Sequence, residues 1–163
     1  MLKKVRVAIV TDRKEMLESL FEGATGKVSE ISPEVEHMEM TVEARYHDDG
    51  NRVSISWDES DASGMQGSRT NVSFAKAEPN VITMLRTGAV KTALVFEKGK
   101  RHHCVYQTPV MPFEVAVATN EVKNNVEGVG TLELDYAVEL RGGVADRTKM
   151  RMMILPYYDS PEA

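Results

Sequence analysis

The segment 96–109, FEKGKRHHCVYQTP, gathers imidazole, thiol, phenol and cationic side chains, which can bind ligands or transfer protons. If this segment is a strand, His102, Cys104 and Tyr106 share one face, because side chains alternate between the two faces of a strand. Cysteine and tyrosine favour the inner face. We therefore expect His102 to lie inside the fold, beside the Tyr106 hydroxyl.

Charged residues elsewhere in the chain also occupy inward-facing positions. Arg86 has the same parity as the apolar Met84, and Glu59 has the same parity as Trp57. A buried arginine needs a carboxylate partner, because an unpaired charge in apolar surroundings is costly. Glu59 or Glu97 could be that partner.

Together these residues predict a polar cluster at one end of the fold that could hold a small anionic or polar ligand. Its members are Glu59, Arg86, Glu97, His102 and Tyr106. The structural alternative is that the same residues form an ion-pair and hydrogen-bond network that closes the fold at that end.

The histidines do not have the spacing of a metal site. His102 and His103 are adjacent, so on a strand their side chains diverge, and His37 and His47 are ten positions apart. We predict no metal site and no cofactor.

An enzyme is the second alternative function, and it would use His102, Tyr106 and Glu59. Cys104 follows His103 directly, but neighbours on a strand face opposite ways, and the pattern shows no oxyanion loop and no third orienting group. A small buried thiol is the simpler interpretation of Cys104. We therefore lean against an enzyme and assign no catalytic residue.

Composition narrows the class of protein. The 163 residues carry a formal net charge of -5, which argues against broad nucleic-acid binding. A single cysteine excludes an intramolecular disulfide and fits the cytoplasm. The apolar run in MLKKVRVAIVTDRK is interrupted by Arg6 and ends by Thr11, too short for a signal peptide or a membrane span.

Alternation with a period of two dominates the chain and predicts strands. The clearest examples are Met38 to Tyr46, Val53 to Trp57 and Leu132 to Leu140. Short turns such as Asp48-Asp49-Gly50-Asn51 favour antiparallel neighbours. A closed barrel of eight to ten strands satisfies this pattern without exposed edges, and a two-sheet sandwich is the alternative architecture.

One short helix is predicted over Arg13 to Phe21, followed by a loop over 22–34. We find no repeat, no low-complexity tract and no linker. The expectation is therefore one all-β domain over 1–163, with its core at about residues 3–155.

Four sequence blocks, in this order, resemble the YwiB-like family of small bacterial proteins of unknown function. They are ESDASGMQGSRT (59–70), LRTGAVKTALVFEKGKRHHCVYQTP (85–109), FEVAVAT (113–119) and LELDYAVELRG (132–142). The resemblance implies an antiparallel calycin or lipocalin-like β-barrel, and it implies no activity. The chain departs from the family pattern at 14–34, which looks longer, and at Met111-Pro112, where the family often has a glycine.

The leading prediction is non-enzymatic binding of a small polar or anionic ligand in or at the mouth of the barrel. The first alternative is a homodimeric or protein-interaction module, which requires apolar residues on the outer face. Val105 and Ala137 are such positions.

Overall fold

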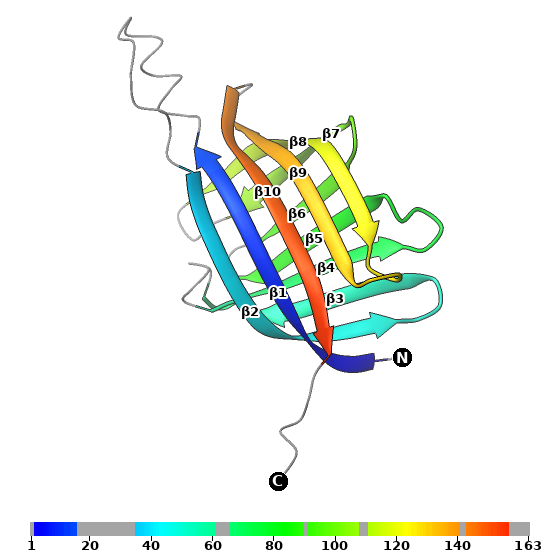
Figure 1. The fold of residues 1–163 in the computed structure, drawn as a ribbon. Coiled ribbons are helices and arrows are strands. Elements are labelled where there is room, and N and C mark those ends of the chain that lie inside the picture. Colours follow the sequence, from blue (N-terminus) through cyan, green and yellow to red (C-terminus); the bar gives the residue numbers. More distant parts are fainter. Residues whose placement is uncertain are drawn as a thin grey trace, which may run out of the picture.

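Ten antiparallel strands form one continuous sheet that curves into a nearly closed barrel (Figure 1). The computed structural model describes residues 2–15, 35–60, 66–89, 91–107, 111–140 and 143–156. The strands are β1 (Leu2–Glu15), β2 (Val35–Asp48), β3 (Arg52–Asp58), β4 (Ser68–Ala75), β5 (Val81–Gly88), β6 (Thr92–Glu97), β7 (Arg101–Gln107), β8 (Pro112–Asn125), β9 (Thr131–Leu140) and β10 (Gly143–Pro156). Their order is β6-β5-β4-β3-β2-β1-β10-β9-β8-β7, which confirms the all-β antiparallel barrel.

The helix predicted over 13–21 is wrong at its start. Residues 13–15 belong to β1, where Arg13 pairs with Glu36 of β2 and with Thr148 of β10. Hydrogen bonding to strands on both sides outweighs the helical spacing of the side chains. Residues 16–21 and the loop predicted over 22–34 lie outside the described residues. In the part of the chain that is described, no helix is long and apolar enough to cross a membrane.

The barrel closes between β6 and β7 through a few contacts rather than a full ladder. At one end, Lys91 and Gln107 exchange two backbone hydrogen bonds, of 2.9 and 2.8 Å. At the other end, the amide of Lys100 donates a 3.0 Å hydrogen bond to the Glu97 carbonyl across the β6–β7 turn. We call the interval between these contacts the seam.

The apolar face of each strand points into the barrel, as the alternation predicts. The largest fully buried side chains are Phe74, Phe96, Ile55, Ile82, Met84, Leu132, Leu134, Met152, Val7, Val53, Val72 and Val117. Phe96 of β6 packs against Tyr136 of β9, with ring centroids 4.6 Å apart. This contact holds β6 to the far side of the seam through side chains.

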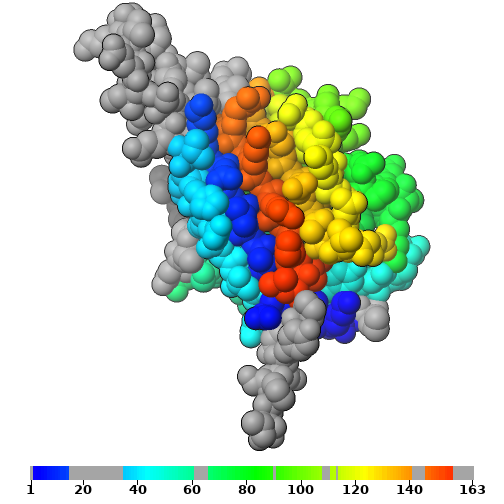
Figure 2. Space-filling view, viewed as in Figure 1, coloured from blue at the N-terminus to red at the C-terminus, as the bar shows by residue number. Residues whose placement is uncertain are grey.

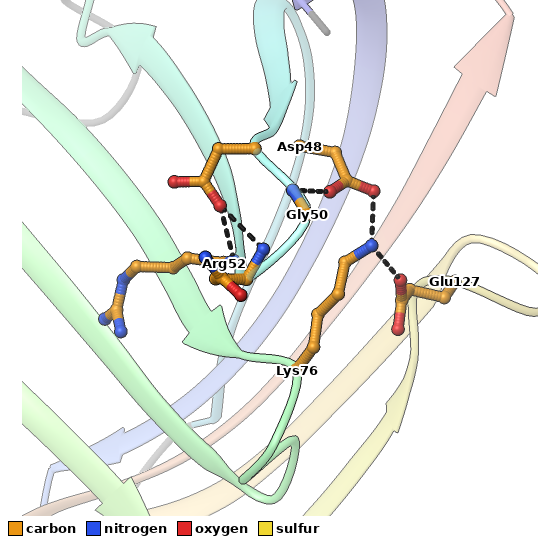
Figure 3. A network of polar contacts seen from close by, with 7 residues as sticks. Asp48, Gly50, Arg52, Lys76 and Glu127 are labelled. Carbon is orange, nitrogen blue, oxygen red and sulfur yellow. Dashed lines mark hydrogen bonds and ion pairs between the residues drawn. The ribbon is translucent and has the colours of Figure 1, made fainter.

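A polar network ties three hairpin connections together at one end of the barrel (Figure 3). The ammonium group of Lys76, after β4, lies 2.7 Å from a carboxylate oxygen of Asp48 and 3.2 Å from one of Glu127. Asp48 also accepts a hydrogen bond from the amide of Gly50, whose positive φ of 93° forms the β2–β3 turn. The hydrogen bond from Lys76 lowers the pKa of Asp48 below its ordinary value. These contacts fix the end of the barrel where the chain makes its tight turns.

Candidate functional site

A cavity of about 490 Å³ lies inside the barrel, toward the ends of β1, β3, β5, β7 and β9 and the starts of the strands that follow them. This is the end opposite the Lys76 network. Its apolar wall includes Met38, Met40, Trp57, Met84, Leu94 and Met150. Its polar wall includes Arg13, Glu36, Glu59, Arg86, Tyr106, Tyr136 and Asp146. The described lining contains no histidine and no cysteine.

Glu59 follows directly after β3 and faces the cavity, as its parity predicts. Only 8% of the residue is exposed. One carboxylate oxygen, Oε1, accepts a 3.0 Å hydrogen bond from the indole of Trp57 and a 2.6 Å hydrogen bond from the hydroxyl of Thr70. Trp57 and Thr70 are cross-strand partners, so the β3–β4 ladder itself positions both donors. The other oxygen, Oε2, is buried and has no hydrogen-bond partner.

Arg86 also lines the cavity, from β5. It pairs with Thr70 on one side and with Thr92 on the other, so it lies in the same cross-strand row as Trp57. Its Nε atom is buried and has no hydrogen-bond partner. Among the described residues no ion pair joins Arg86 to Glu59 or Glu97, so the structure differs from the partnership expected for this arginine.

Two tyrosines complete the polar wall near Arg86. Tyr106 of β7 is half-buried, as the alternation predicts. Tyr136 of β9 was not among the predicted site residues, although its parity with the apolar Leu134 marks it as inward-facing. Burial raises the pKa of the Tyr136 hydroxyl, and the nearby charge of Arg86 partly offsets this rise. The two phenols and the guanidinium therefore face one region of the cavity.

Glu97 and His102, the remaining predicted site residues, lie elsewhere. They contact each other at 3.2 Å across the β6–β7 hairpin, and about a third of each side chain is exposed, 37% and 36%. Neither lines the cavity. The barrel therefore brings Glu59, Arg86 and Tyr106 to the cavity but leaves His102 out. The enzymatic combination of His102, Tyr106 and Glu59 is not assembled.

Three further charged residues line the cavity that the sequence reasoning did not identify. Arg13 and Glu36 form a 3.8 Å ion pair between β1 and β2. Asp146 follows a register shift in β10 and accepts a hydrogen bond from Thr148. Arg13 was missed because it lies in the predicted helix, and Glu36 because it lies between the loop predicted over 22–34 and the strand predicted over Met38 to Tyr46. The bulge, which re-aims side chains, concealed the aspartate.

His37 is adjacent to Glu36 in the sequence and joins the same two strands, but on the outer face of the sheet. Figure 2 shows this outer face. The Nδ1 atom of His37 lies 2.5 Å from Asp12 of β1, and its Nε2 atom lies 3.1 Å from Glu39 of β2. Lys149 of β10 lies opposite Asp12 on the other side of β1. The hydrogen bonds to Asp12 and Glu39 raise the pKa of His37 above 6.5.

A raised pKa in the folded protein means that protonated His37 stabilises the fold. That contribution is complete below the ordinary value of 6.5 and is lost as the pH rises through the raised pKa. We expect His37→Gln to lower the thermal midpoint by about 1–3 °C near pH 5.5 and to have little effect near pH 8.5, since exposed ion pairs contribute modestly. Thermal unfolding of both proteins across this range measures the effect. An equal loss at both pH values would contradict it.

Comparisons with known proteins agree with this architecture. Residues 24–152 match the family described as a domain of unknown function (DUF1934). Among solved structures, the chain is similar to the ywiB protein from Bacillus subtilis, with a TM-score of 0.65, 16% sequence identity and 96% of each chain covered. At this identity the likeness shows the fold alone. No curated protein sequence matches the chain.

Proposed function

Because the chain belongs to the DUF1934 family, which is defined without an activity, we propose from the cavity itself that the protein binds a small anionic ligand inside its barrel, without catalysis. The observation that carries this proposal is Arg86, a cation that lines the cavity with a buried, unpartnered Nε. A buried guanidinium N–H is costly unless an anion or another acceptor meets it, and the planar fork of arginine suits carboxylate, phosphate or sulfonate groups.

The other charged groups of the cavity each have at least one polar partner, although Glu59 is hydrogen-bonded through Oε1 alone. Arg13 pairs with Glu36, and Asp146 accepts a hydrogen bond from Thr148. Arg86 is therefore the cation of the described lining that remains available to an anion. The Tyr106 and Tyr136 side chains line the same cavity near Arg86.

The size and apolar wall of the cavity define the rest of the ligand. Its volume of about 490 Å³ lies within the range usual for small-molecule sites, roughly 300–1,000 Å³. Met38, Met40, Met84 and Met150 line it, and methionine side chains adapt to ligands of varied shape. The ligand we propose therefore has an apolar body as well as an anionic group. We place this binding in the cytoplasm, a location supported by the single cysteine.

The alternative role as a homodimer or interaction module has less support. Leu85 and Val105 are exposed on the outer face, at 44% and 47%, but Ala137 is buried at 8%. The described residues expose four further large apolar side chains, Leu2, Val35, Met111 and Val129. Singly exposed apolar residues are ordinary for a protein surface. We therefore favour the cavity.

The test uses 8-anilinonaphthalene-1-sulfonate, an apolar fluorophore with a sulfonate. Trp57 is the single tryptophan of the chain and lines the cavity, so a bound fluorophore should quench its emission by energy transfer. We expect saturable binding at one site. N-phenyl-1-naphthylamine, which lacks the sulfonate, should bind about tenfold more weakly, as expected for loss of one charge-assisted hydrogen bond. Non-saturable binding, or equal affinity for both fluorophores, would overturn the proposal.

A further inference from the structure

The two oxygens of the Glu59 carboxylate have different surroundings. Oε1 accepts hydrogen bonds from both Trp57 and Thr70, whereas Oε2 is buried without a partner. Buried polar atoms are nearly always hydrogen-bonded, because an unsatisfied acceptor loses its interaction with water and gains nothing in return. A buried carboxylate oxygen that faces a cavity therefore marks a place for a donor.

The surroundings of Glu59 also fix its orientation. The two donors to Oε1 come from neighbouring strands, and the Glu59 amide donates a 2.8 Å hydrogen bond to the Ser68 carbonyl of β4. The backbone hydrogen bond and the two hydrogen bonds to Oε1 thus fix the orientation of the Glu59 carboxylate. Oε2 is left to accept a hydrogen bond from another molecule. A role limited to holding Trp57 and Thr70 would use Oε1 alone.

Arg86 and Glu59 lie on opposite sides of β4. Glu59 is one pleat beyond the row that contains Trp57, Thr70 and Arg86. Their backbones are therefore separated by two strand spacings, about 10 Å, and by about 7 Å along the strands. Both side chains extend into the cavity over β4, so their charged ends can meet the two ends of one small head group.

We propose that the ligand of the cavity is a zwitterion of the amino-acid type, whose anionic group binds Arg86, whose ammonium group donates to Oε2 of Glu59, and whose apolar substituent packs on the methionine wall. This inference rests on the proposed function and adds the second recognition point. Three charged residues of the described lining have a buried polar atom without a hydrogen-bond partner, namely Arg13, Glu59 and Arg86. Arg13 is paired with Glu36, and one zwitterion would account for the other two.

The experiment compares three eight-carbon probes as competitors of bound 8-anilinonaphthalene-1-sulfonate. Octanoate has only the anionic group, octylamine has only the ammonium group, and 2-aminooctanoate has both. We expect 2-aminooctanoate to displace the fluorophore at about one tenth of the octanoate concentration, the gain typical of one charge-assisted hydrogen bond. Octylamine should compete less well than 2-aminooctanoate, because it has no anionic group for Arg86.

Glu59→Gln tests the assignment to one oxygen. The amide carbonyl still accepts from Trp57 and Thr70, while an NH₂ group replaces Oε2 and turns the acceptor into a donor. We expect this variant to bind the two acids equally. Asp58→Asn is the matched control, since Asp58 is the adjacent acid and its side chain is 85% exposed; it should keep the tenfold preference.

The outcomes separate the two proposals. If the fluorophore does not bind beside Trp57, the proposed function fails and this inference fails with it. If octanoate competes but the wild-type protein shows no preference for 2-aminooctanoate, or Glu59→Gln keeps that preference, the zwitterion is wrong and the anion site stands. The wild-type comparison needs no variant, so poor folding of Glu59→Gln would not prevent a decision.

Discussion

Arg86→Gln lowers the affinity for 8-anilinonaphthalene-1-sulfonate by about tenfold or more, because the sulfonate loses a charge-assisted hydrogen bond worth roughly 1.5–3 kcal/mol. The same change should leave the thermal midpoint equal or slightly higher. No ion pair among the described residues depends on Arg86, so its removal leaves no carboxylate without a partner. A residue that contributes to binding but not to stability is the signature expected of a functional site. Fluorescence titration and thermal unfolding measure the two effects.

Arg69→Gln is the control for this prediction. Arg69 lies on β4, the strand beside β5, but it is exposed and pairs at 3.6 Å with Asp58 outside the cavity. The Arg69→Gln variant removes the same charge from a nearby position outside the cavity. We expect it to change the affinity less than twofold, because an exposed charge contributes little free energy. An equal loss in both variants would show that net charge, and not contact with Arg86, attracts the fluorophore.

Phe96→Ala should destabilise the protein by about 3–5 kcal/mol, the usual cost of removing a large aromatic side chain from a packed core. Phe96 is fully buried, and its ring packs at 4.6 Å against Tyr136. The loss is expected near the upper end of that range, because β6 and β7 share few backbone hydrogen bonds along the seam. Chemical denaturation followed by circular dichroism gives the free energy of unfolding.

The matched control for Phe96→Ala is Leu85→Ala. Leu85 belongs to β5, the strand that pairs with β6, but its side chain points outward and is 44% exposed. We expect a change within about 0.5 kcal/mol, as for most surface substitutions. A small loss in Phe96→Ala, comparable to that of Leu85→Ala, would mean that the seam does not depend on the aromatic contact.

The alternation of apolar and polar residues was sufficient to predict most of the fold, because each strand shows its inward apolar face in its own sequence. It also showed which residues face inward. Glu59, Arg86 and Tyr106 were predicted on this basis, and all three line the cavity.

Parity gives the face of a residue but not its depth in the barrel. His102 and Tyr106 share a face of β7, yet they are four residues apart, about 13 Å along a strand. His102 therefore lies beside the hairpin with Glu97, and Tyr106 lies at the cavity. Depth follows from the register between strands far apart in sequence, such as β1 with β10, which no local pattern contains. Arg13 and Asp146 were missed for other reasons, namely the helix predicted over 13–21 and the register shift in β10.

The strand order also bears on chain connectivity. In space the sheet runs from β7 through β10 and β1 to β6, so the first and last strands are neighbours in its middle (Figure 1). A circular permutant that joins β10 to β1 and is cut at the turn after β6 would pair every strand with its predecessor in sequence. Its contact order would fall, since the β1–β10 ladder is the pairing with the longest loop to close. The seam, which has few backbone hydrogen bonds, is therefore the natural site for new termini.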